Sequence, residues 1–278
     1  VRGRERSRKM EDILAECRSL IEGGCKEITL LGQNVNSYGK DLDTKIDFAD
    51  LLAEIAELPG DFLIRFMTSH PRDAGQKLFD TMAKYPKIAK QLHLPFQSGS
   101  SRVLKAMNRH YDREQYLELV KYAKSVMPDL VLTSDVIVGF PGETEEDFLE
   151  LCEFTKEARF DRLGVFTYSR EEDTPAYDFP DQIDEQIKQD RYDIIMKEQM
   201  LIGAELNERK IGTVVRVLCE DYDPVSETCY GRSDADAPDI DGKVYFRAFP
   251  RPMPGSYVDV QISDVVDYDL FGEALIRK

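Results

Sequence analysis

Residues 130–144 read Leu-Val-Leu-Thr-Ser-Asp-Val-Ile-Val-Gly-Phe-Pro-Gly-Glu-Thr, and they carry the strongest signal of the architecture in this chain. Residues 130–138 form its clearest apolar run and predict a buried strand. The pair Pro141-Gly142 predicts a turn, and Thr144 with Asp147 three residues later predicts a capped helix that runs from residue 145 to about residue 158. A buried strand that leads directly into a helix is typical of a parallel sheet.

The same alternation extends on both sides of this stretch, from residue 9 to about residue 170. We expect four more buried strands at residues 28–31, 63–67, 91–94 and 163–168, with amphipathic helices between them. Five strands are too few for an eight-stranded barrel, so the pattern predicts an α/β fold in which residues 1–183 form a partial parallel (β/α) barrel. In such sheets the chemistry lies at the carboxyl ends of the strands.

The second half of the chain changes character twice. Residues 170–183 are polar and contain prolines, and a long charged connecting helix is expected over residues 184–210. Over residues 211–278, short alternating segments are separated by Pro, Gly and Asp, which predicts a small all-β barrel. This module has 13 Asp and Glu against 7 Lys and Arg. Its acidity suits a basic protein partner better than RNA, although solubility alone explains the same excess.

Composition narrows the class of protein. The net charge is −16, from 37 Lys and Arg against 53 Asp and Glu, which argues against nonspecific wrapping of nucleic acid. No apolar run approaches the roughly 20 residues that span a membrane, and no secretory signal is present, so we expect a cytoplasmic protein with no membrane partner. The five cysteines are widely spread, and none is expected as a metal ligand. Cys17 and Cys152 are expected as buried thiols.

Small and polar residues follow four of the expected strands. They form the segments 31–34, 68–71, 95–99 and 139–144, in which Gly permits close backbone approach and Gln, Asn and Ser supply neutral hydrogen bonds. A barrel would gather these segments into one ligand site, although each segment alone also fits ordinary connections between elements. His70, His93 and His110 have no metal-ligand partner at useful spacing. Neither a carboxylate pair nor a serine nucleophile motif is present.

The chain opens on a basic run. Against one acid, Glu5, it carries the basic residues Arg2, Arg4, Arg6, Arg8 and Lys9. The run is either a solvated segment before a helix or an anion contact near the mouth of the sheet, for a cofactor carboxylate or a nucleic-acid phosphate.

Four segments taken together resemble the methylthiotransferase family of radical S-adenosylmethionine (SAM) enzymes. They are Val1-Arg-Gly-Arg-Glu-Arg-Ser-Arg8, Leu30-Leu-Gly-Gln-Asn-Val-Asn-Ser-Tyr-Gly39, Leu92-His-Leu-Pro-Phe-Gln-Ser-Gly-Ser100 and Asp135-Val-Ile-Val-Gly-Phe-Pro-Gly-Glu-Thr144. The resemblance covers essentially the whole chain and implies a partial barrel followed by a TRAM domain. It also implies that the chain begins just after the three-cysteine cluster loop, so that this loop and an N-terminal domain in cis belong to the parent enzyme.

The two halves are similar to different branches of this family. The first half resembles the tRNA branch (MiaB type) at residues 34–39, 66–71 and 106–109, and the second half resembles the ribosomal-protein branch (RimO type) at residues 162–171, 230–238 and 267–270. The resemblance implies methylthiolation of an aspartate in a small-subunit ribosomal protein. The alternative substrate is N6-isopentenyl-adenosine beside the anticodon of a tRNA.

The resemblance also implies cofactors. SAM would lie across the strand ends, with contacts to Gln33, Asn34, Ser69, Gln97, Ser98, Asp135 and the backbone around Val138, Gly139 and Phe140. In the family, a [4Fe-4S] cluster on three cysteines cleaves SAM to a 5′-deoxyadenosyl radical, and a second [4Fe-4S] cluster in the N-terminal domain supplies sulfur. The ligands of both clusters are absent from this sequence, so no catalytic residue and no metal ligand is expected in it, and the chain alone is expected to be inactive.

Two other interpretations stay open. One is a non-catalytic module that keeps the substrate-docking surfaces without cluster chemistry. The other is an unrelated (β/α) hydrolase or lyase, which needs a carboxylate pair or a His-centred set at the strand ends. The sequence offers no convincing set of that kind.

Overall fold

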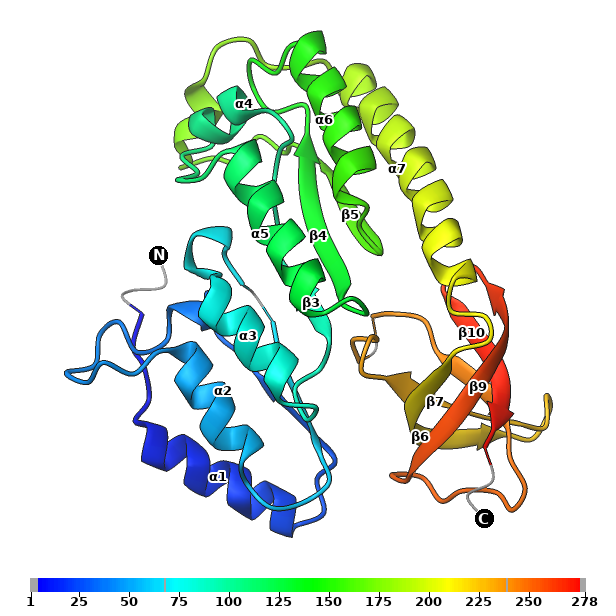
Figure 1. Cartoon of the computed structure of the whole chain (residues 1–278). Coiled ribbons are helices and arrows are strands. Elements are labelled where there is room, and N and C mark those ends of the chain that lie inside the picture. Colours follow the sequence, from blue (N-terminus) through cyan, green and yellow to red (C-terminus); the bar gives the residue numbers. More distant parts are fainter. Residues whose placement is uncertain (1–4, 68, 239, 276–278) are drawn as a thin grey trace. The chain divides into compact units, whose positions relative to one another are not determined.

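The computed structural model describes residues 5–67, 69–238 and 240–275 (Figure 1). The contacts divide the chain into two compact units, residues 1–199 and residues 200–278. We call the first the sheet unit and the second the barrel unit. The boundaries expected at residues 183 and 211 stay predictions, since helix α7 (Glu185–Glu208) runs across the division between the units.

The sheet unit contains five parallel strands in sequence order. They are β1 (Glu27–Leu30), β2 (Leu63–Phe66), β3 (Gln91–His93), β4 (Val131–Val138) and β5 (Arg162–Thr167). Strands β1 and β2 form one ladder and β3, β4 and β5 another, and an isolated parallel bridge between Ile64 and Ile88 connects the two. The five expected strands are therefore confirmed to within one residue at each end, as is the partial parallel barrel.

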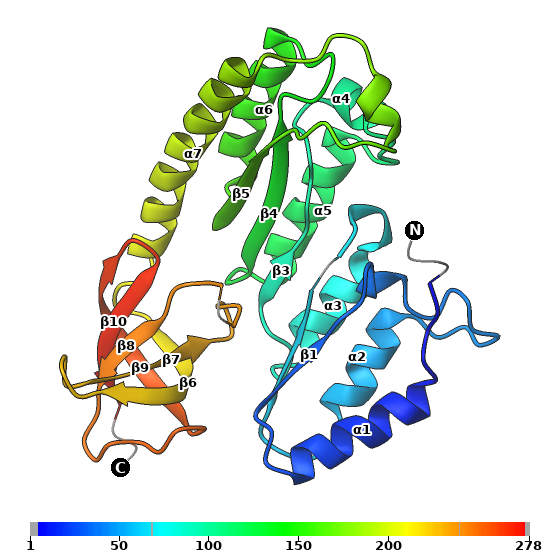
Figure 2. The ribbon, with the colours of Figure 1, turned by 180° about the vertical axis from the view of Figure 1, so that it is seen from behind.

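Helices connect these strands and lie on one side of them. They are α1 (Met10–Glu22), α2 (Phe48–Ala56), α3 (Gln76–Lys84), α4 (Ser101–Ala106), α5 (Arg113–Val126) and α6 (Glu145–Ala158). Figure 1 looks onto the helices and Figure 2 onto the opposite face of the sheet. The capped helix expected after residue 144 is confirmed, because the Thr144 hydroxyl accepts a hydrogen bond from the Asp147 amide.

The core of the sheet unit lies between the strands and the helices. Side chains alternate along a strand, so Leu132, Val136 and Val138 of β4 are buried against the helices. The ring of Phe96 stacks on Phe160 at a centroid distance of 5.1 Å and completes this core. The residues between those of β4 therefore point to the opposite face, which the helices leave open.

The barrel unit is a closed sheet of five strands. They are β6 (Val214–Asp223), β7 (Thr228–Ser233), β8 (Val244–Arg247), β9 (Tyr257–Val266) and β10 (Asp269–Ala274), in the order β10-β8-β7-β6-β9. Among the described strands of this unit, only the β8–β10 pairing is parallel. Val217, Val244 and Val260 are fully buried inside it. The small all-β barrel expected in this part of the chain is confirmed.

Two other sequence expectations need adjustment. Cys17 is buried as expected, but Cys152 is half-buried, because it lies at the flank of the apolar face of α6 near Lys156 and Glu198. The polar linker over residues 170–183 contains a 3-10 helix at Pro175–Asp178 that the sequence pattern does not indicate. Among the described residues, no helix is both long enough and apolar enough to cross a lipid bilayer.

Candidate functional site

The face of the sheet that the helices leave open is polar. Arg65 of β2 lies between two neighbours: its Nε is 3.1 Å from Glu27 Oε2 of β1, and its Nη1 donates to Gln91 Oε1 of β3 at 3.0 Å. Both Arg65 and Glu27 are nearly buried, with side-chain exposures of 3% and 10%. The Arg65 guanidinium therefore connects β1, β2 and β3 across this face.

A second polar group lies further along the same face. His93 of β3 contacts two residues of β4: its Nδ1 is 3.0 Å from Thr133 Oγ1, and its Nε2 is 3.3 Å from Asp135 Oδ2. Gly164 of β5 is the register partner of Asp135. A Cβ at position 164 would lie 2.5 Å from Asp135 Oδ1, so the missing side chain leaves space for this carboxylate.

The carboxyl ends of β1 and β2 meet through side-chain hydrogen bonds. Asn34 donates to Asp73, and Asn36 exchanges hydrogen bonds with the backbone of His70. Burial raises the pKa of Asp73, but hydrogen bonds from Arg72, Lys40 and Asn34 outweigh it and lower the pKa to about 2.

Two oxygens at these strand ends have no protein partner. They are Asn34 Oδ1 and Ser69 Oγ, both buried and without a hydrogen bond from any described residue. A buried polar atom without a partner costs free energy, and such atoms in a native fold point to a bound water or ligand. They are the strongest sign of a ligand position at the ends of β1 and β2.

Residues that follow β3 contact both β4 and the segment after β2. Gln97 has a φ of 71° and exchanges backbone hydrogen bonds with β4, donating to the Asp135 carbonyl and accepting from the Ile137 amide, each at 3.0 Å. The Tyr111 hydroxyl donates to the Phe96 carbonyl at 3.0 Å, and the Tyr111 ring packs on His70 at 5.7 Å. Burial raises the pKa of Tyr111 to about 12, so it stays a neutral donor.

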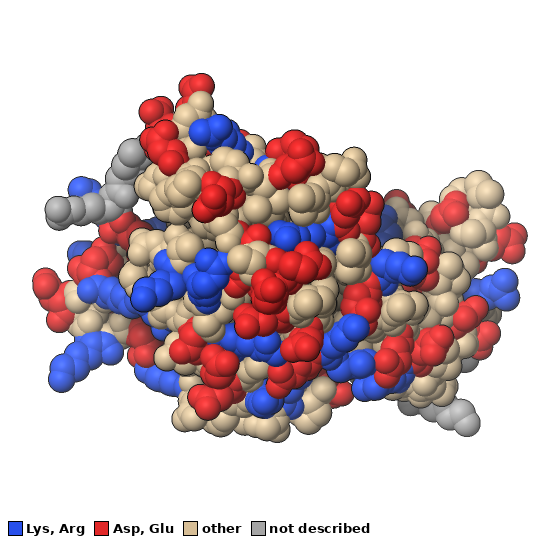
Figure 3. Space-filling view, turned by 90° about the horizontal axis from the view of Figure 1, so that it is seen from above, with Lys and Arg blue, Asp and Glu red and all other residues tan. Residues whose placement is uncertain are grey.

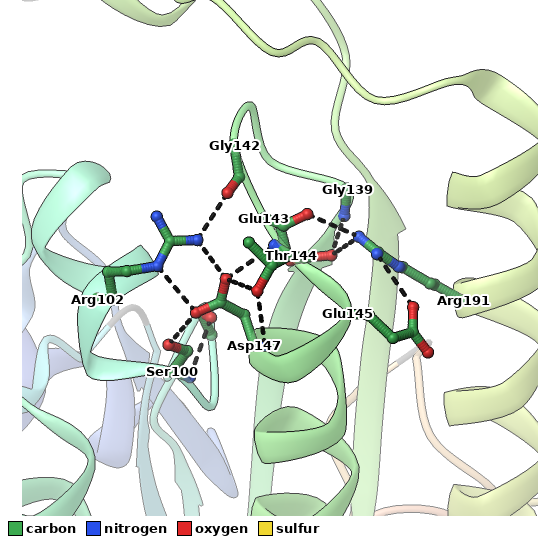
Figure 4. Close-up of polar contacts among 10 residues, drawn as sticks. Ser100, Arg102, Gly139, Gly142, Glu143, Thr144, Glu145, Asp147 and Arg191 are labelled. Atoms are coloured by element: carbon green, nitrogen blue, oxygen red, sulfur yellow. Dashed lines mark hydrogen bonds and ion pairs between the residues drawn. The ribbon is translucent and has the colours of Figure 1, made fainter.

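The end of β4 is held by a buried ion pair (Figure 4). The Glu143 carboxylate accepts from the Gly139 amide at 2.9 Å and from Arg191 Nη1 of α7 at 2.6 Å. Burial raises the pKa of Glu143, although these two hydrogen bonds act in the opposite direction. The Val138 carbonyl accepts from the Tyr168 amide at 2.9 Å. Two of the backbone groups that the sequence offers for a cofactor at residues 138–140 are therefore already used by the protein.

A second carboxylate stabilises the helix that follows. Asp147 of α6 pairs with Arg102 of α4 and accepts from the Ser100 hydroxyl at 2.7 Å, as Figure 4 shows. Burial raises the pKa of Asp147, but the hydrogen bonds from Arg102, Ser100 and Thr144 lower it far below its usual range. This cluster connects the loops after β3 and β4 and holds them at one end of the sheet.

The candidate residues thus fall into two groups. Asn34 and Ser69 lie at the ends of β1 and β2, whereas Gln97 lies beside Asp135 at β3 and β4. Ser98 is 2% exposed and its hydroxyl accepts from the Ser100 amide, so it lies beneath the surface. The side chain of Val138 is packed in the core, and Phe140 packs edge-on against Tyr168 at 5.4 Å.

Gln33 lies with the basic opening of the chain, at a groove that Asn34 also lines. It is exposed at this groove, which has a volume of about 480 Å³ and lies between α1, β1 and residues 5–8. Arg6 and Arg8 also line this groove, but Arg8 is paired with Glu16 at 2.7 Å. Arg2 and Arg4 lie outside the described residues, so their expected role as anion contacts stays a prediction.

Comparison with known families agrees with this architecture. The family model of the Radical SAM superfamily matches residues 1–155, and that of the TRAM domain matches residues 211–275. The chain belongs to the Radical SAM superfamily. Membership in this superfamily implies SAM and iron–sulfur chemistry, and the TRAM match coincides with the closed barrel.

Known relatives of this radical SAM chain come from both branches of the methylthiotransferases. The tRNA-2-methylthio-N(6)-dimethylallyladenosine synthase of Alkaliphilus oremlandii is 45% identical over 279 residues, which cover 99% of this chain and 57% of that protein. The ribosomal protein uS12 methylthiotransferase RimO of Clostridioides difficile is 42% identical over 276 residues, covering 99% of this chain and 62% of that protein. The resemblance to the MiaB and RimO types is confirmed. The chain spans about three fifths of the length of these relatives.

A solved structure aligns more distantly. The radical SAM enzyme coproporphyrinogen III oxidase (HemN) from Escherichia coli has a TM-score of 0.48 and 19% identity, over 72% of this chain and 47% of that one. A match at this level bears on no detail of the site.

The two cofactors of a radical SAM enzyme fit this chain to different degrees. The unpartnered oxygens of Asn34 and Ser69, together with the half-exposed Asp135 carboxylate, suit the ammonium group and the hydroxyls of SAM. A cluster on three thiolates does not fit, because Cys17 lies buried on α1, Cys152 lies on α6, and Cys219 and Cys229 lie in the barrel core. Burial raises the pKa of Cys17 and of Cys152, which disfavours the thiolate form that binds iron.

Sequence reasoning missed three contributors to this site. The sequence offers no metal-ligand partner for His93 and does not indicate its neighbour Asp135, which lies beside it in the structure. Arg191 and Lys188 belong to the long charged helix, yet Lys188 Nζ donates to the Tyr168 carbonyl at 3.0 Å. In the sequence, residues 91 and 93 of one strand and residues 133 and 135 of the next are expected on the same face of the sheet. This period of two was the signal that could have placed the histidine near the aspartate. No local signal distinguishes these two buried cations from the exposed charges of α7.

Proposed function

We propose that this chain comprises the partial (β/α) barrel and the TRAM domain of a cytoplasmic radical SAM methylthiotransferase. The observation that carries the proposal is the identity of 45% and 42% to two methylthiotransferases, each extending over 99% of the chain. The described fold agrees with it, since the sheet unit ends in polar loops where a cofactor would bind and a closed barrel follows.

SAM is proposed to lie across the ends of β1 to β4. Asn34 and Ser69 would bind its polar groups through their free oxygens, while Gln97 and Asp135 would do so from the adjacent strands. Bound there with an iron–sulfur cluster, SAM supplies a radical that removes hydrogen from an unactivated carbon. The residues of this chain bind and orient SAM and the substrate.

Both [4Fe-4S] clusters are proposed to bind to other parts of the parent enzyme, so that this chain alone is inactive. The positions of its five cysteines support this proposal. The test is anaerobic reconstitution of the chain with iron and sulfide. We expect no visible absorption of an iron–sulfur cluster after desalting, and a stable cluster that cysteine substitutions remove would contradict the proposal.

The proposed substrate is an aspartate of a small-subunit ribosomal protein. RimO of Clostridioides difficile acts, by its name, on ribosomal protein uS12, and the second half of this chain carries the segments of that branch. The acidic barrel unit supports a basic protein as partner. The face in Figure 3 shows acidic and basic side chains interleaved, whereas a nucleic-acid footprint is a continuous basic stripe.

A tRNA is the second candidate substrate. The relative from Alkaliphilus oremlandii, at 45% identity, is named for a methylthio modification of a tRNA adenosine. The segments of that branch lie in the first half of the chain, beside the proposed cofactor position at β1 and β2. The two candidates therefore depend on different halves of one chain.

Two chimeric enzymes separate these candidates. In each, this chain replaces the matching part of one of the two relatives, and the enzyme is reconstituted anaerobically and given SAM with unmodified uS12 or undermodified tRNA. Modification of uS12 by both chimeras would support the ribosomal-protein assignment, and modification of tRNA by both would support the second. If neither chimera modifies anything while both parents do, the methylthiotransferase proposal is wrong.

A further inference from the structure

His93 Nε2 lies 3.3 Å from Asp135 Oδ2, within ion-pair distance. An ionised carboxylate only accepts hydrogen bonds, so this approach favours the form of the ring in which Nε2 carries the proton. In the neutral ring Nδ1 is then an acceptor, and the Thr133 hydroxyl donates to it at 3.0 Å. Thr133 is nearly buried, which fixes the orientation of the imidazole ring.

This arrangement occupies one oxygen of the carboxylate and leaves the other over Gly164. Asp135 Oδ1 lies 2.5 Å from the position of a Cβ at residue 164, so any larger residue there would force the carboxylate to move. The Asp135 side chain remains 34% exposed on the face that the helices leave open. His93 thus lies beside Oδ2, while Oδ1 lies over Gly164 in a side chain that stays partly exposed.

We propose that His93 is a positioning residue for the cofactor: with Thr133 and Gly164 it fixes the Asp135 carboxylate so that Oδ1 accepts hydrogen bonds from bound SAM. This inference rests on the proposed function, in which Asp135 contacts SAM. His93 itself acts through Asp135 and makes no contact with the reacting atoms. A carboxylate held before binding loses less conformational freedom when the ligand arrives, which strengthens binding.

Isosteric substitutions of His93 test this inference. The amide nitrogen of Gln reaches the position of Nε2, whereas Asn reaches only that of Nδ1. His93→Gln therefore keeps the donor to Asp135, and His93→Asn removes it. The probe is SAM, and its dissociation constant is measured by equilibrium dialysis on the whole chain, with urea unfolding of each variant in parallel. We expect His93→Gln to bind within about threefold of the wild type and His93→Asn to bind about tenfold more weakly, the size of one hydrogen bond to a charged group.

Gly164→Ala tests the position of the same Asp135 carboxylate from the neighbouring strand β5. The atoms in the way are Asp135 Oδ1 at 2.5 Å and the Phe166 ring at 3.1 Å. Both belong to side chains rather than to backbone, so the strand can keep its place while the carboxylate turns. We expect about a tenfold loss of SAM affinity with little change in the urea midpoint. His110→Asn is the matched control, since His110 is exposed in a separate groove beside Tyr111, and its affinity should equal that of the wild type.

The outcomes separate this inference from the function on which it rests. Equal SAM affinity in the wild type, His93→Asn and Gly164→Ala would overturn the positioning role alone. A loss shared equally by His93→Gln and His93→Asn, in step with lost stability, would mean that the histidine is only structural. A wild-type chain that binds no SAM would contradict the proposed cofactor position, and the inference would fall with it.

Discussion

At the scale of single residues, the buried pair of Glu143 and Arg191 holds the end of β4. Both side chains are nearly buried, at 1% and 7% exposure, and α7 supplies the arginine. Removing one partner of such a pair leaves a charge in a medium that solvates it poorly. The pair also orients the Gly139 amide through the Glu143 carboxylate.

We predict that Arg191→Met lowers the free energy of unfolding by about 3–5 kcal/mol. The double variant Glu143→Leu with Arg191→Met should lose less than the single variant, because no unpaired charge remains in the interior. Urea unfolding gives both values. The control is Arg209→Gln, which breaks an exposed pair with Glu205 and should change stability by less than about 0.5 kcal/mol. Equal effects at positions 191 and 209 would contradict the prediction.

A second prediction at this scale concerns pH. Burial, with the nearby charges of Arg109 and Arg72, lowers the pKa of His70 below its usual value of about 6.5. As the pH falls, His70 therefore binds its proton at a higher pH in the unfolded chain than in the folded chain. Stability from this residue is therefore complete above about pH 6.5 and decreases as the pH falls below it.

The variant His70→Asn keeps an acceptor for the Arg72 amide and removes the titrating ring. We expect the free energy of unfolding to fall less steeply for this variant than for the wild type between about pH 7 and about pH 5. Urea titrations at several pH values measure both slopes. Indistinguishable slopes would show that His70 titrates equally in the folded and unfolded chains.

At the scale of elements, the helices follow from their end signals. Asp112 begins α5 with a capping box: its carboxylate accepts from the Gln115 amide at 2.8 Å, and Gln115 accepts from the Asp112 amide at 3.1 Å. Asp112→Ala should lower stability by about 1 kcal/mol. Asp129→Ala removes the same charge from an exposed turn and should stay within about 0.5 kcal/mol of the wild type. Equal losses in the two variants would exclude the cap as the cause.

Strands and helices could be predicted because their apolar period is local. The strand expected over residues 130–138 is β4, one residue shorter at its start, and the helix expected over residues 145–158 is α6. The site could be predicted only in part, since its polar segments follow strands but their partners come from elsewhere. The contact of His93 with Asp135 joins residues 42 positions apart, and the Glu143–Arg191 pair spans 48. Such contacts depend on strand order and on the direction of α7, which no local pattern encodes.

At the scale of the whole molecule, each unit has its own hydrophobic core. The barrel unit encloses Val217, Phe246 and Val260 in a closed sheet. We predict that residues 200–278 fold alone, with a cooperative urea transition and dispersed amide resonances. Val260→Asp, which puts a charge into that core, should abolish the transition. An unfolded isolated barrel unit would show that it depends on residues 1–199.

The place of β10 in the barrel has a consequence for synthesis on the ribosome. Asp269–Ala274 is the last of the described strands, yet it pairs with both β8 and β9 and closes the ring. The sheet unit, built from neighbours in sequence order, is able to gain structure while translation continues. The barrel unit has to wait until β10 has left the exit tunnel, so its earlier strands remain open to chaperones until then.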